Sequence, residues 1–250
     1  MLFTFIDLFC YINIERSDKM PSVIIHRCVS KRVLDKTNLY TNENDKYFYD
    51  IGSLTPDSWR NTKRFKDSLL PKKEKRKYSH FSNDGEFIEN YDIFYNKYKK
   101  YLDEKNPFMV GYLVHLITDN FWRYDMFYKS FFPDGSIKMI DMSIMNADKH
   151  EKKDLLNKET KKVSRELGKY YELVLLRHIT EEETSTFPMM DEIEYDGIND
   201  SIDYNNFEIE FEDNSNYELQ VFSKEDFIKG VERCSNYIID RLMEYNIIKR

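Results

Sequence analysis

Residues 107–122 read PFMVGYLVHLITDNFW, a stretch with apolar side chains on nearly every face of the helix that it predicts. Asn106 can cap this helix, and Pro107 suits its first position. Only His115 and Asp119 within it can carry charge, and their spacing of four residues places them on one face. An imidazole and a carboxylate in apolar surroundings need compensation from each other, from a proton or from a metal ion.

The pair His115–Asp119 has two interpretations. Ligands at positions i and i+4 of a rigid helix can hold one metal ion, as helical HxxxD and HxxxH pairs do. The alternative is a buried histidine and aspartate joined by a hydrogen bond, without a metal. The choice depends on whether the fold brings further ligand residues to the pair.

The rest of the chain predicts further helices, from apolar residues at three- and four-residue spacing and from capping residues at their ends. Gly52 permits a turn, after which Thr55 can cap a helix with Pro56 at its first position and Asp57 in its first turn. The expected helical ranges are 22–34 with Ser22 as cap, 47–51, 84–102, 107 to about 131, 147–179, and 223 onward with a Ser223–Asp226 capping box.

An acidic stretch interrupts this helical pattern near the C-terminus. His178–Ser223 contains 14 acidic residues and neither lysine nor arginine, so the rest of the chain carries a net charge of +7 against −7 overall. An acidic chain is a poor candidate for duplex DNA binding, whereas a basic body can attract a phosphate-bearing substrate. Phe207–Glu212 alternates strictly and predicts a strand, with Tyr217–Val221 as its hairpin partner. The predicted fold class is therefore all-α, with a small acidic β-hairpin excursion.

The length allows one large domain or two small ones, and we expect a single helical domain over residues 20–250 with an acidic insertion at about 181–222. The 250 residues are 41% hydrophobic and 16% aromatic, which allows a sizeable core. Residues 1–19 are interpreted as an upstream extension or disordered N-terminus, with Met20 as an alternative start. Residues 1–13 are apolar but too short to span a bilayer, and they lack the features of a signal peptide. Three widely separated cysteines favour a reducing compartment, so we expect a cytoplasmic protein.

Three further residues can supply metal ligands, and each also has an ordinary interpretation. His26 can be a core or surface histidine, Asp57 a helix-start acid, and His80 a loop histidine. The basic run at residues 72–77, KKEKRK, precedes His80 and is usually just solvated. These weak signals gain weight only if a known arrangement links them.

Their order along the chain resembles that of the bacterial zinc-dependent phospholipase C family, whose superfamily also contains fungal single-strand nucleases. The similarity covers about residues 20–155 and rests on the motifs MPSVIIH, GSLTPD, SHF and GYLVHLITD. It implies an all-α fold and two zinc ions, with a carboxylate bridging them. Asp57 would also act as the catalytic proton acceptor. The zinc ligands that the resemblance implies are His26, Asp57, His80, His115 and Asp119.

A third zinc site of that family matches this chain less well. The family uses a further histidine and then His-x-x-x-Glu, whereas this chain has Asp125, followed by His150 and Asp154. His150 can equally be an exposed histidine in a polar run. The family also uses the amino-terminal amine as a ligand, which would require this chain to begin near Pro21.

The function implied by the resemblance is zinc-dependent hydrolysis of phosphoric esters by a metal-bound hydroxide. The substrate would be a phospholipid head group or a soluble phosphodiester. One alternative is a nuclease or small-molecule phosphodiesterase on the same fold, and another is a non-catalytic helical protein for metal binding or interaction. The sequence leaves open the substrate and the oligomeric state, and it predicts no binding of duplex nucleic acid.

Overall fold

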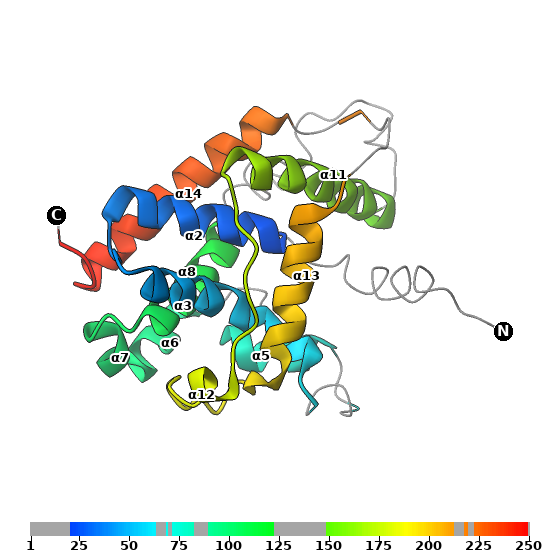
Figure 1. The fold of residues 1–250 in the computed structure, drawn as a ribbon. Helices are drawn as coiled ribbons and strands as arrows, with labels where there is room; N and C mark the ends of the chain where they lie inside the picture. Colours follow the sequence, from blue (N-terminus) through cyan, green and yellow to red (C-terminus); the bar gives the residue numbers. More distant parts are fainter. Residues whose placement is uncertain are drawn as a thin grey trace.

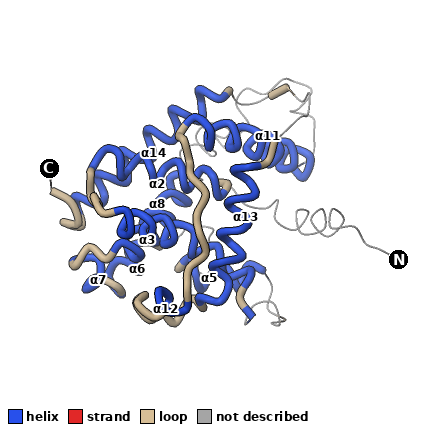
Figure 2. Tube along the Cα trace, in the orientation of Figure 1, coloured by secondary structure: helices blue, strands red, loops and turns tan. Residues whose placement is uncertain are grey.

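Helices make up the regular structure of the described residues in the computed structural model (Figures 1 and 2), and these residues contain no strand. The all-α prediction is therefore confirmed for this part of the chain. No helix among them has the length and apolarity needed to cross a membrane. The described residues are 21–63, 69, 72–82, 90–122, 149–212, 218–219 and 223–249.

The predicted central helix is α8 (Pro107–Phe121), and it contacts most of the surrounding helices. Asn106 caps it as expected, because its side chain accepts a hydrogen bond from the backbone N–H of Met109. Every residue from Phe108 to Asp119 is buried, so this helix has no solvent face over that range. The predicted continuation to Phe131 lies outside the described residues.

Two glycines allow α8 to cross α3 (Glu43–Leu54) at backbone contact. A Cβ atom at Gly52 would lie 2.0 Å from the carbonyl oxygen of Phe108, and one at Gly111 would lie 2.0 Å from the carbonyl oxygen of Tyr49. Any side chain at either position would force the helices apart. Gly52 lies inside α3 rather than at a turn, so the predicted turn there is wrong.

Helix α2 (Val23–Thr37) lies beside α8, and α11 (Lys149–Tyr170) and α14 (Lys224–Glu244) pack against it. The predicted cap is confirmed, since Oγ of Ser22 accepts a hydrogen bond from the N–H of Ile25 at 3.3 Å. The capping box of Ser223 and Asp226 at the start of α14 is also confirmed. Buried cysteines on α2 and α14, Cys28 and Cys234, form no disulfide.

Two predicted helices differ in extent from those observed. The range 84–102 is occupied by α6 (Tyr91–Lys97) and α7 (Lys99–Asp103), which are interrupted at Tyr98, and residues 83–89 lie outside the described residues. The range 147–179 contains only α11, because Glu172 adopts a left-handed conformation with φ 51° and the N–H of Leu173 bonds to Gly168.

The segment 173–179 is extended instead of helical, and it crosses the molecule between α11 and α12 (Glu181–Thr184) in Figure 1. Two asparagines of α13 (Ile198–Glu210) form hydrogen bonds with backbone groups of the segment 173–179. Asn206 bonds to both the N–H and the carbonyl of Leu176, and Asn199 does the same for Ile179. These side chains replace the hydrogen bonds that a helix would have supplied.

The acidic stretch is largely helical, so the predicted strand at Phe207–Glu212 is wrong. Phe207–Glu210 forms the last turn of α13, and most of the predicted partner strand lies outside the described residues. The burial of Glu208 accounts for the helical conformation of residues 207–210. Glu208 is buried and lies 2.9 Å from Nε of Arg165 and 3.3 Å from Nζ of Lys161, which places it with the inward-facing residues of α13.

Candidate metal centre

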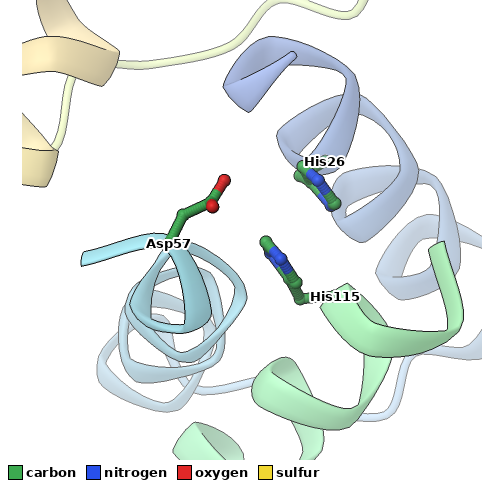
Figure 3. A group of neighbouring side chains, drawn as sticks. All are labelled: His26, Asp57 and His115. Atoms are coloured by element: carbon green, nitrogen blue, oxygen red, sulfur yellow. The ribbon is translucent and has the colours of Figure 1, made fainter. Parts of the chain in front are cut away.

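The five residues that the resemblance implies as ligands lie together in the structure. His26 extends from α2, Asp57 from η1 (Thr55–Asn61), and His80 ends α5 (Lys72–His80), while His115 and Asp119 belong to α8. They form two overlapping groups that could hold a metal ion, and the ligand atoms within each lie within 4.8 Å of one another. The first group is His26, Asp57 and His115 (Figure 3), and the second is His80, His115 and Asp119.

Local structure at Asp57 and His80 differs in detail from the sequence interpretation. Asp57 lies in the first turn of a short 3₁₀ helix with Pro56 at its start, as predicted, but Thr55 is not its cap. The hydroxyl of Thr55 donates to the carbonyl of Ile51 in the preceding helix. The basic run before His80 is helical, so His80 occupies a helix end rather than a loop.

Asp119 is the centre of the arrangement. Its Oδ1 lies 3.1 Å from Nε2 of His26, close enough for an ion pair but without hydrogen-bond geometry. Its Oδ2 lies 3.5 Å from Nε2 of His80 and 3.8 Å from Nε2 of His115. Asp57 approaches from the other side, with Oδ1 3.7 Å from the same nitrogen of His80. Three imidazoles therefore surround one carboxylate, and a second carboxylate lies beside them.

Backbone and hydroxyl groups orient two of the imidazoles toward the carboxylates. Nδ1 of His115 lies 2.7 Å from the carbonyl oxygen of Ser53, so it carries the proton and leaves the lone pair on Nε2. Nδ1 of His80 lies 2.8 Å from Oγ of Ser79. The rings of His26 and His115 stack with centroids 3.9 Å apart. A hydrogen bond on one nitrogen that frees the other is the usual support of a metal-ligating histidine.

The buried nitrogens fit a metal ion. Nε2 of His26, His80 and His115 has no hydrogen-bond partner among the described residues, although each histidine is at most 2% exposed. A buried polar atom without a partner costs free energy, and a cation beside the two carboxylates would satisfy these lone pairs. Imidazole nitrogen and carboxylate oxygen are also the donor types that zinc accepts.

Electrostatics favour the protonation states that bind metals. Burial and the neighbouring His26 lower the pKa of His115 to about 3. Burial and the charge of Arg76 lower the pKa of His80 well below its ordinary value. Burial opposes ionisation of Asp119, but Arg76, His26 and His115 together hold its pKa well below the usual range. Neutral imidazoles and an ionised carboxylate need no deprotonation before they ligate a cation.

The structure describes no side chain of the residues predicted for a third site. Asp125 is outside the described residues, as is the N-terminal segment through Met20. His150 and Asp154 are four residues apart on α11, but their side chains are not among those described. The third site therefore stays a prediction.

Two groups at the centre have no role there in the sequence interpretation, which includes Arg76 only as part of a basic run that is usually solvated. Arg76 forms an ion pair with Asp119, and the carbonyl of Ser53 orients His115. The position of Arg76 four residues before His80 is a usable signal, because both project from one face of a helix. A backbone carbonyl has no sequence signature, so no pattern in the chain indicates the role of Ser53.

Comparisons of this chain with protein-family models, with curated proteins and with solved structures gave no match. Membership of the phospholipase C family accordingly stays a prediction, and the functional argument rests on the chain's own residues.

Proposed function

We propose that this protein is a zinc-dependent hydrolase of phosphoric esters, similar to phospholipase C. One observation carries the proposal. Five residues chosen in sequence order, from segments spread over nearly 100 positions, converge on one buried polar centre inside an apolar core. An isolated cluster of this composition could be a structural network. Its agreement with the order of ligands in a zinc hydrolase family favours catalysis.

The residues that would hold zinc are His26, Asp57, His80, His115 and Asp119. Zinc supplies Lewis-acid chemistry, since it polarises a phosphoryl oxygen and lowers the pKa of a bound water toward ~7. Asp57 would accept a proton from that water, because its side chain is 12% exposed whereas those of the other four are at most 4% exposed. Asp57 is therefore the candidate ligand that a substrate arriving from solvent would meet most readily.

Metal content and hydrolysis together test the proposal. Protein purified without added metal should contain zinc and should hydrolyse bis(p-nitrophenyl) phosphate. Asp57→Asn should abolish hydrolysis while far-UV circular dichroism stays unchanged. Asp203→Asn is the matched control, because Asp203 contacts an exposed histidine far along the chain from the centre. Absence of zinc, with no loss of stability in a chelator, would overturn the proposal.

The burial of the centre favours a second candidate, a non-catalytic protein in which the metal is structural. Closed zinc sites that contribute folding energy are typically shielded from solvent, and four of the five residues are. Such a protein would bind zinc and lose stability in a chelator, yet would hydrolyse no phosphodiester. The same pair of measurements therefore separates the two candidates.

A further inference from the structure

Arg76 occupies a specific position beside the candidate metal centre. It lies on α5 four residues before His80, so both side chains project from one helical face toward the same place. Nη2 of Arg76 donates a hydrogen bond to Oδ2 of Asp119. The imidazole nitrogens of His80 and His115 face this same oxygen. A positive side chain therefore lies at the oxygen around which the candidate ligands gather.

The Arg76 side chain also lies on the solvent side of the centre. It is 21% exposed, compared with 4% for Asp119 and 0% for His80. The other partly exposed member is Asp57, on the η1 helix that packs against α5. A substrate approaching the buried ligands from solvent would meet Asp57 and Arg76 first.

Charge balance changes the role of Arg76 when the centre holds zinc. The charged side chains of the candidate centre include two carboxylates, Asp57 and Asp119, and the guanidinium of Arg76. One divalent cation would neutralise the two carboxylates, and the two zinc ions that the resemblance implies would leave the centre positive, so Arg76 would then face a like charge across the oxygen of Asp119. A further anion beside the guanidinium would stabilise this arrangement, because the carboxylate of Asp119 would otherwise be shared between Arg76 and the metal.

We propose that Arg76 is a substrate-binding residue that recognises the non-bridging oxygens of a phosphoryl group. Asp119 holds the guanidinium at the entrance of the centre until that group arrives. This inference rests on the proposed function, because it assigns the anion to the substrate of the zinc centre. It extends that function because Arg76 would recognise the part of the substrate that carries at least two free phosphoryl oxygens.

The guanidinium suits this role better than an ammonium would. Its planar fork can donate two parallel hydrogen bonds to two oxygens of one phosphoryl group, and it always stays charged. Lysine at this position would keep the charge and lose the fork. Arg76→Lys therefore separates recognition of the phosphoryl group from simple charge balance at Asp119.

Binding of inorganic phosphate to the zinc-loaded full chain tests the inference. Isothermal titration calorimetry should give a phosphate affinity about tenfold or more weaker in Arg76→Gln, and several-fold weaker in Arg76→Lys. Lys77→Gln is the matched control, because it removes the same charge from the next position of α5 and should leave the affinity unchanged. All samples are saturated with zinc before titration, to offset any weaker metal affinity of the variants, and zinc content measured on them should be equal.

Each outcome has one meaning. Equal phosphate affinity in the wild type and Arg76→Gln, with equal zinc content, overturns the role of Arg76 and leaves the zinc hydrolase proposal standing. Loss of zinc in Arg76→Gln makes Arg76 a structural partner of Asp119 and also overturns the inference. If Arg76→Gln does not fold, unchanged phosphate affinity in Arg76→Lys overturns it. Absence of zinc from the wild type overturns both proposals.

Discussion

Among the described residues, a histidine meets an aspartate in two places, and these differ in almost every other respect. Nε2 of His178 lies 2.6 Å from Oδ1 of Asp203, a shorter contact than any between Asp119 and the three histidines around it. The side chains of His178 and Asp203 are 56% and 64% exposed, whereas that of Asp119 is 4% exposed. If the contact distance alone were used to select a candidate metal site, the exposed pair His178–Asp203 would be chosen before the buried group at Asp119.

Burial and the number of unsatisfied atoms distinguish the two places. Water can satisfy every polar atom of an exposed pair, so the contact of His178 with Asp203 contributes little and requires no ligand. At Asp119 three imidazole nitrogens lack hydrogen-bond partners among the described residues, and each of these histidines is at most 2% exposed. The unsatisfied atoms, rather than the short distances, distinguish the group that could hold a metal ion.

Asp119→Asn should have the largest effect, because it changes the residue at the middle of the buried centre. The amide keeps the shape of the side chain but removes the charge that three histidines and Arg76 surround. Loss of even an outer partner of a ligand typically costs 10–100-fold in metal affinity, so loss of this carboxylate should weaken zinc binding by more than about 100-fold. Competition with a fluorescent chelator measures the affinity.

Asp203→Asn is the control for that substitution, because it makes the same chemical change at the exposed pair. Its zinc affinity should equal that of the wild type. Equal zinc affinity in Asp119→Asn and Asp203→Asn would remove the distinction between the buried and exposed pairs.

Gly111→Ala should have the next largest effect, through the crossing of α3 and α8 that holds the buried centre. The added Cβ would lie 2.0 Å from a backbone oxygen of Tyr49, which cannot rotate away. Overpacking of this kind typically costs 1–3 kcal/mol, and we expect a loss of about 3 kcal/mol in the free energy of unfolding. Urea denaturation followed by circular dichroism measures the loss.

Gly168→Ala is the matched control on another helix. A Cβ there would lie 3.4 Å from Cγ2 of Ile24, at the border of ordinary contact. Alanine also favours helix over glycine, so the free energy of unfolding should stay the same or rise by up to about 1 kcal/mol. Similar losses in both variants would show that the close approach at Gly111 is unimportant.

The sequence predicts the parts of this fold that depend on local pattern. The apolar run and the Asn106 cap identify α8, and the capping box at Ser223 identifies the start of α14. The sequence suggests the five candidate ligands only through the resemblance to the zinc-dependent phospholipase C family, and their binding of a metal stays a prediction.

The errors occur where a distant partner decides the local structure. Phe207–Glu212 alternates like a strand, yet the burial of Glu208 against Arg165 makes this region helical. Gly52 resembles a turn residue, yet the carbonyl of Phe108 explains why it has no side chain. In each case the deciding contact lies more than 40 residues away, beyond the reach of any local pattern.

His178→Ala should have the smallest effect, and it tests the exposed side of the comparison. The side chain is more than half exposed, and surface substitutions of this kind usually change stability by less than about 0.5 kcal/mol. Zinc content and phosphodiester hydrolysis should equal those of the wild type, because the short contact with Asp203 supports no centre. His115→Ala provides the contrast, since it should lower zinc content in the same assay. A loss of zinc in His178→Ala as large as in His115→Ala would mean that burial does not distinguish the two places.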